Sequence, residues 1–114
     1  IPYLDHAAIE FPELTIVAGH IGYPWTAEMI SLATKYSNVY IDTSAYKSGR
    51  YPRELVEYMR GHGRKKVLFG SNYPMLTPAD CLRDLTSLGL DDQATRMFLY
   101  ENAARVFSLE WDAK

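Results

Sequence analysis

The sequence predicts an α/β fold in which three short parallel strands alternate with helices. The apolar pattern switches repeatedly between the helical period of about 3.6 residues and short continuous runs that are typical of buried strands. Most helical stretches begin at a proline or at a capping residue, which marks their N-termini. Such a cycle is typical of a parallel sheet whose strands are joined by crossover helices.

Three apolar runs are predicted to form the strands, over residues 14–19, 38–42 and 66–70. Their centres are rich in β-branched and aromatic residues and continuously apolar, as expected for strands that are covered on both faces. The repeating alternation of strands and helices predicts parallel pairing in chain order, with right-handed crossovers. We therefore expect a three-stranded parallel sheet with helices on one side.

The helical stretches have recognisable ends. Thr26 is expected to be an N-cap, Pro52 suits the first helical turn, and Thr77 with Pro78 forms a strong helix start that Gly89 should close. Predicted helices cover residues 2–11, 26–36, 52–62, 78–88, 92–100 and, behind an Asn102 cap, 103–109.

Composition excludes several classes of function. The chain has 114 residues, enough for one domain, and a net charge of -2 with acidic and basic residues interspersed. Without a basic stripe, nucleic acid is not an expected partner. No apolar run approaches the roughly 20 residues of a membrane span. Cys81 is the single cysteine, so no intrachain disulfide can form, which is compatible with the cytoplasmic location that we expect.

Polar residues follow each predicted strand. His20 follows the first strand, Asp42 ends the second, and Asn72 follows the third. Ligands of parallel α/β folds bind at the carboxyl ends of the strands, so these side chains are candidates for a common site. Alternation along the strands would place His20 on the face of Ile16. Four aromatic residues stand in the same loops and could line a pocket or seal the rim: Tyr23, Trp25, Tyr46 and Tyr73.

Each candidate also has a structural explanation. His20 could be a structural hydrogen-bonding residue, although its flanking glycines favour a functional one. Asp42 could cap its own loop, and Asn72 could be an ordinary turn former. His6, between apolar positions of a helix, and His62, at a helix end, are interpreted as structural.

Four segments resemble the amidohydrolase-related family, which includes the aminocarboxymuconate semialdehyde decarboxylase-like proteins. Residues 11–22 resemble the family's sixth strand, 38–44 the seventh, 67–74 the eighth, and Glu101-Asn102-Ala103-Ala104-Arg105-Val106-Phe107 its closing helix. The resemblance implies a TIM (β/α)8 barrel, which needs about 250 residues. Residues 1–114 would then be the C-terminal portion of such a barrel, a partial domain from helix 5 through helix 8.

The resemblance also implies a metal, commonly zinc, and roles for two residues. The family's ligands are a His-x-His pair on the first strand, a His on the fifth and an Asp on the eighth, while the sixth-strand His is catalytic. His20 takes that catalytic position, and Asn72 occupies the position of the metal-binding Asp. A neutral amide is a poorer zinc ligand, and the other ligands would precede Ile1, so no metal is expected in this chain alone.

Three functions follow as hypotheses. The first is a fragment of a metal-dependent hydrolase acting on a small carboxylate-, amide- or ester-like substrate. In this hydrolase His20 would be the general acid/base, and Asn72 would be a weak metal ligand or a hydrogen-bond donor. The residues expected to contact the substrate are Tyr23, Trp25, Asp42, Tyr46 and Tyr73. The second is a decarboxylase of the same family. The third is a non-catalytic half-barrel that self-associates as a homo-oligomer to cover inward-facing Ile16, Tyr40 and Leu68. The remaining alternative is a truncated product with no function of its own.

Overall fold

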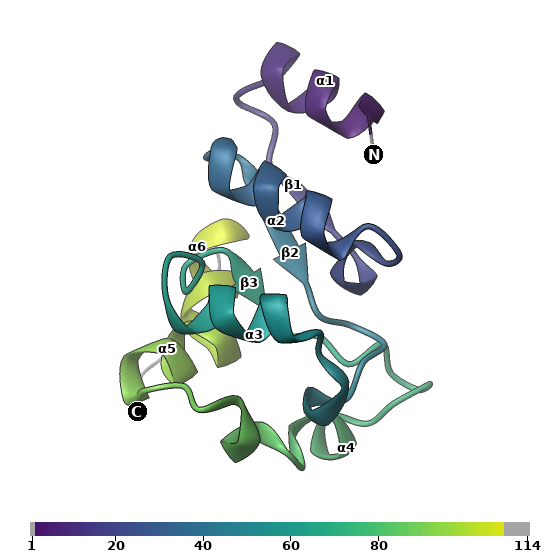
Figure 1. Ribbon diagram of the computed structural model, residues 1–114, viewed down its shortest axis with the longest axis vertical. Coiled ribbons are helices and arrows are strands. Elements are labelled where there is room, and N and C mark those ends of the chain that lie inside the picture. Colours follow the sequence, from purple (N-terminus) through teal and green to yellow (C-terminus); the bar gives the residue numbers. More distant parts are fainter. Residues whose placement is uncertain (1, 109–114) are drawn as a thin grey trace.

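The computed structural model describes residues 2–108, in which helices and short strands alternate (Figure 1). Three 3-10 turns interrupt the connections, at His20–Gly22, Ser48–Arg50 and Leu85–Leu88, and a π turn spans Met97–Glu101. In chain order the helices and strands are α1 (Pro2–Glu10), β1 (Ile16–Ala18), α2 (Thr26–Lys35), β2 (Val39–Asp42), α3 (Arg53–Arg60), β3 (Val67–Leu68), α4 (Pro78–Leu82), α5 (Asp92–Arg96) and α6 (Asn102–Val106).

The three strands form one parallel sheet in the order β1-β2-β3, as predicted. Ile16 pairs with Val39, and Ile41 pairs with Val67. Each strand is shorter than predicted. The chain leaves the extended conformation after β1 because it enters the 3-10 turn with positive φ at His20 (43°).

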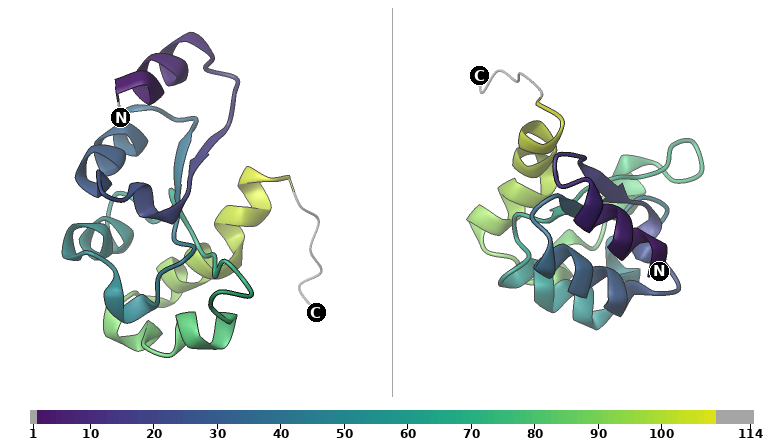
Figure 2. Two further views of the ribbon diagram at one scale, coloured as in Figure 1. Left: turned by 90° about the vertical axis from the view of Figure 1, so that its right-hand side faces the viewer. Right: turned by 90° about the horizontal axis from the view of Figure 1, so that it is seen from above.

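One face of the sheet carries the core. The register places Val39, Ile41 and Val67 on this face, and all three are at most 1% exposed. The helices α2 and α3 lie side by side against it, together with α1 (Figure 2, right). From α2 and α3 the fully buried contributions to the core are Met29, Ala33, Leu55 and Met59.

The opposite face of the sheet carries different side chains from those predicted. Ile16 was expected to share the inward face with Tyr40 and Leu68, but it pairs with Val39, and it is Val17 that pairs with Tyr40. Because facing residues of neighbouring strands point to the same side of a sheet, Ile16 packs with the helix-covered core instead. Leu68 is only 2% exposed, so it is not left open to water.

Several helix ends differ from the prediction by one residue or by a break. Trp25 is the N-cap of α2, where Thr26 was expected. Pro52 is the N-cap of α3, although it was predicted to lie in the first helical turn. The predicted helix 78–88 breaks at Asp84, whose φ of -105° and ψ of 24° are not helical, and a 3-10 turn follows. Gly89 closes that turn with φ 64°, as predicted.

Residues 92–106 form one continuous helical stretch rather than two helices. Asn102 has helical φ and ψ of -63° and -46°, so it does not cap a new helix. Its side chain instead donates to the carbonyl oxygens of Arg64 (2.7 Å) and Val67 (2.9 Å). The N–H of Phe69 donates to the carbonyl of Phe98 (3.2 Å). The helical stretch therefore forms hydrogen bonds with the edge of β3 that faces away from β2. Residue 109, the end of the predicted last helix, lies outside the described residues.

Within residues 2–108, no helix has the length and apolar character that are needed to cross a membrane.

Candidate functional site

The turn after β1 directs His20 toward the end of β2. Gly19 is extended, and His20 and Ile21 then adopt positive φ values of 43° and 55°. Ile21 is 1% exposed and anchors the turn in the core, while the His20 side chain stays exposed. Strand alternation therefore does not apply to His20, because the turn, not the pleat of β1, sets the direction of its ring.

His20 heads a hydrogen-bonded chain of three side chains. Its Nδ1 lies 3.0 Å from Oγ and 3.1 Å from the carbonyl oxygen of Ser44. The Ser44 hydroxyl in turn donates to Oδ2 of Asp42 at 2.6 Å. The end of β1 is thereby joined to the end of β2, over 24 residues of sequence.

These contacts assign the proton on the imidazole ring. A backbone carbonyl oxygen only accepts hydrogen bonds, and the Ser44 hydroxyl proton is already donated to Asp42. Both partners of His20 Nδ1 are therefore acceptors, so Nδ1 carries the proton in the neutral ring. The lone pair is then on Nε2, and this nitrogen is able to accept a proton or bind a metal.

Asp42 lies in a niche between two glycines. An added Cβ on Gly70 would come within 2.5 Å of Oδ1, and one on Gly19 within 3.9 Å of Oδ2. The Ser44 N–H also donates to Oδ1 at 3.3 Å. Asp42 therefore does cap its own loop, which was the structural explanation for it, and through Ser44 it also holds His20.

Asn72 lies in the turn after β3 with φ 64°. Its Nδ2 lies 3.3 Å from Sδ of Met75, and its carbonyl accepts from the Met75 N–H at 2.9 Å. Among the described residues no hydrogen bond joins Asn72 to His20 or Asp42. The structure therefore places Asn72 at the same end of the sheet, in a turn, without bringing it into the chain of His20, Ser44 and Asp42.

The four loop aromatics separate into two groups. The rings of Tyr23 and Tyr46 lie 6.5 Å apart and so link the loops after β1 and β2. Trp25 and Tyr73 are 53% and 72% exposed. Tyr46 also lines a cleft of about 300 Å³ between the loops after β2 and β3, whose other lining residues are Ala45, Lys47, Arg50, Met75 and Leu76.

Sequence reasoning missed Ser44, Lys47 and Arg50 as candidates. Ser44 stands two residues after Asp42, a spacing from which a hydroxyl can reach the carboxylate in a local turn. Lys47 and Arg50 follow the aromatic residue Tyr46 in a strand-end loop. This position in the sequence is the feature that could have indicated a ligand-binding role. Their place beside the cleft could be recognised only in the folded chain.

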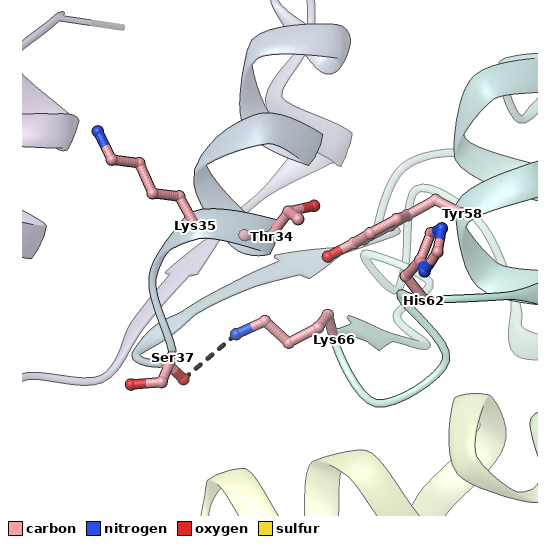
Figure 3. Close-up of a pocket in the computed structure, with 7 residues that line it drawn as sticks. Thr34, Lys35, Ser37, Tyr58, His62 and Lys66 are labelled. Atoms are coloured by element: carbon pink, nitrogen blue, oxygen red, sulfur yellow. Dashed lines mark hydrogen bonds between the residues drawn. The ribbon is translucent and has the colours of Figure 1, made fainter.

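A second cleft, of about 350 Å³, lies at the opposite end of the sheet (Figure 3). There the Lys66 ammonium donates to the carbonyls of Tyr36 (3.0 Å) and Ser37 (3.2 Å) and lies over the Tyr40 ring. Burial, and to a smaller extent the charge of Arg105, lowers the pKa of Lys66. Lys66 therefore satisfies carbonyls after α2, a structural role, and Figure 3 shows Lys35 pointing away from it.

The described residues do not fit a metal centre by themselves. No three His, Cys, Asp or Glu side chains of residues 2–108 are grouped so that they could hold a metal ion. A catalytic zinc site takes three protein ligands and a water molecule. Within the described residues, His20 and Asn72 would supply at most one nitrogen and one oxygen donor, fewer than a catalytic zinc needs.

Comparison with known proteins gives one family and one fold. The family described as Amidohydrolase matches residues 1–109. An uncharacterised TIM-barrel protein, Bb4693, from Bordetella bronchiseptica superposes with a TM-score of 0.84 at 25% identity. Amidohydrolase 2 from Bifidobacterium longum subsp. infantis superposes with a TM-score of 0.69 at 24% identity. No curated protein matches the chain.

The superpositions cover nearly all of this chain but less than half of each barrel. The aligned parts are 95% of this chain and 39% of the Bordetella chain, and 94% of this chain and 45% of the Bifidobacterium chain. The three parallel strands with their helices are therefore consistent with part of a TIM barrel, in agreement with the predicted fold class.

Proposed function

Since the chain belongs to the amidohydrolase family, we propose that it supplies part of a hydrolase active site in which His20 is the general base and then the general acid. The observation that carries the proposal is the pair of acceptors on His20 Nδ1, which leaves Nε2 free to take a proton. The chain spans less than half of the two barrels that it resembles. Activity on the natural substrate is therefore proposed for the assembled site, while His20 should give this chain activity on a reactive ester.

In the proposed reaction Nε2 of His20 removes a proton from water while the water oxygen bonds to the carbonyl carbon of an ester or amide. The imidazolium then gives this proton to the leaving oxygen or nitrogen as its bond to carbon breaks. Asp42, one hydroxyl away from the ring, stabilises the positive charge that His20 carries between the two steps. General acid–base catalysis of this kind contributes about 10²–10⁴-fold to the rate.

The remaining candidates take supporting roles in the proposal. Asn72, exposed at the end of β3, is assigned as a hydrogen-bond donor to the substrate. Tyr23 and Trp25 after β1 and Tyr73 after β3 are assigned to the wall of the pocket. Their exposure of 69%, 53% and 72% leaves apolar surface available for contact with a substrate. A zinc ion remains an expectation from the family resemblance and would need ligands beyond the described residues.

Hydrolysis of p-nitrophenyl acetate tests the proposal. The chain should release p-nitrophenol above the buffer rate, and His20→Gln should return the rate to background, because glutamine cannot take up a proton. His62→Gln is the matched control, since His62 is also exposed and lies at the opposite end of the sheet. Equal rates for the wild type and His20→Gln, or no release by the wild type, would contradict the proposal for this chain.

A second candidate function, self-association, is favoured by a different observation. Ile9, Phe11 and Leu14, at the end of α1 and before β1, are 55%, 51% and 51% exposed. The three residues are close in sequence, and a group of exposed large apolar side chains is typical of contact sites. A homo-oligomer that covers these residues is therefore proposed as the alternative to a purely catalytic role.

A further inference from the structure

The cleft beside Tyr46 adjoins the candidate site. Its lining includes Ala45, the residue directly after Ser44, and Ser44 contacts His20. The Ala45 N–H donates to the carbonyl of Ser71 at 3.4 Å, so the loops after β2 and β3 are joined at this point. The cleft therefore lies between two strand-end loops, at the end of the sheet where parallel α/β proteins bind ligands.

Two cationic side chains line the cleft. The Arg50 N–H donates to the carbonyl of Lys47 at 2.8 Å and closes the turn that contains both residues. Both side chains line the same space. Neither side chain makes an ion pair with a carboxylate within the part of the chain that the structure describes. Both charges therefore remain available to a ligand.

The nearby carboxylates do not cancel this charge. Asp80 is paired with Arg83 at 2.6 Å. A hydrogen bond from Thr77, followed by the charges of Arg83 and Lys47, lowers the pKa of Asp80. Asp84 lies against Gly49, where an added Cβ would be 2.8 Å from Oδ2. With Asp80 and Arg83 paired to each other, Lys47 and Arg50 outnumber Asp84 beside the turn, which leaves a surplus of positive charge at the cleft.

The other walls of the cleft define the kind of anion. Ala45, Met75 and Leu76 are apolar, and Tyr46 adds an aromatic ring. A volume of about 300 Å³ is at the small end of ligand-binding pockets. Guanidinium binds carboxylate through two parallel hydrogen bonds. The cleft therefore matches a small organic acid with one carboxylate and an apolar or aromatic body.

We propose that this cleft binds the carboxylate of the substrate through Lys47 and Arg50, with the apolar body against Ala45, Met75 and Leu76. Its relation to catalysis rests on the proposed role of His20, while the binding itself does not. The substrate class of the proposed hydrolase is thereby narrowed to small esters or amides that also carry a free carboxylate.

Isothermal titration with benzoate, and with benzamide as its neutral counterpart, tests the proposal. Benzoate should bind the wild type, and Lys47→Gln/Arg50→Gln should weaken binding about tenfold to a hundredfold, as expected for the loss of charge-assisted hydrogen bonds. Benzamide should bind both proteins weakly and equally. The matched control is Arg53→Gln/Lys65→Gln, which removes the same charge from exposed positions outside the cleft and should bind benzoate like the wild type.

Three results would overturn the proposal. These are equal benzoate affinity in the wild type and the Lys47→Gln/Arg50→Gln variant, equal affinity of benzoate and benzamide for the wild type, and binding of inorganic phosphate without binding of benzoate. His20→Gln is titrated in parallel and should bind benzoate like the wild type. If it binds benzoate but the wild type shows no esterase activity, the carboxylate site holds and only the proposed catalytic function fails.

Discussion

Gly70 lies against the carboxylate of Asp42 so closely that a Cβ on Gly70 would be 2.5 Å from Oδ1. The same atom would lie 3.1 Å from Cβ of Ser44. The absence of a side chain after β3 is thus what allows the carboxylate at the end of β2 to reach the hydroxyl that contacts His20.

The first prediction is that Gly70→Ala displaces Asp42 and destabilises the fold by about 1–3 kcal/mol, the usual cost of overpacking. Gly19→Ala is the matched control, because its Cβ would meet the same carboxylate at an ordinary 3.9 Å and its φ and ψ of -74° and 160° suit alanine. Urea denaturation measures both variants. If Gly70→Ala is as stable as Gly19→Ala, the niche does not constrain Asp42.

The second prediction concerns the tautomer of His20. Long-range ¹H–¹⁵N NMR at about pH 9, well above the ordinary imidazole pKa of about 6.5, should show the proton on Nδ1. Ser44→Ala removes one acceptor and the link to Asp42 but leaves the backbone carbonyl, so both tautomers should then be populated. Ser31→Ala, on the exposed side of α2, should leave the spectrum of His20 unchanged. A proton on Nε2 in the wild type would exclude the proposed hydrogen-bond chain.

The third prediction concerns Asn102, which is 0% exposed and donates to two backbone carbonyls. Asn102→Asp replaces the donor by a carboxylate that faces those carbonyls, so stability should fall by about 3 kcal/mol or more. Asn72→Asp makes the same chemical change at an exposed position and should have little effect. Thermal unfolding followed by circular dichroism compares the two variants, and similar melting temperatures would exclude this role for Asn102.

The fourth prediction is a loss of stability at alkaline pH through Tyr51. Burial raises the pKa of this phenol from 10.0 to about 12, although Thr43 and Ser48 oppose part of the shift. Between these two pH values the unfolded chain loses the proton and the folded chain keeps it, so stability falls as pH rises. A tenfold change in acid strength is worth about 1.4 kcal/mol, so the loss amounts to about 2–3 kcal/mol.

Tyr51→Phe should abolish that part of the alkaline loss, since phenylalanine has no proton to release. Tyr73→Phe, at a residue that is 72% exposed, should keep it. Urea denaturation at a series of pH values compares the variants. A Tyr51→Phe protein that loses as much stability as the wild type between about pH 10 and 12 would show that Tyr51 is not the titrating group.

The fifth prediction tests self-association through the exposed residues near α1. Analytical ultracentrifugation at micromolar concentration should show a species larger than the monomer, and Phe11→Ser/Leu14→Ser should shift it to the monomer by removing apolar contact area. Tyr73→Ser is the control, since Tyr73 is exposed in a loop after β3. A compact wild-type monomer over this range would contradict the alternative function.

The elements of this protein follow largely from local sequence. The β-branched runs around Val17, Tyr40 and Leu68 identify the three strands and their parallel order, because apolar period and crossover handedness are properties of short segments and their connections. Thr77 and Gly89 likewise mark helix ends through their own backbone preferences. His20, Asp42 and Asn72 were recognisable as candidates because parallel strands bring their carboxyl ends together.

Contacts between distant segments were decided only by the tertiary structure. The pairing of Ile16 with Val39 depends on strand register, which a single strand does not specify. Asn102 looked like a helix cap but donates to Val67, 35 residues away. The ring of His20 meets Ser44 because a turn with positive φ follows β1. Local sequence determined where strands and helices form, whereas side-chain direction at the site depends on backbone geometry and packing across the whole sheet.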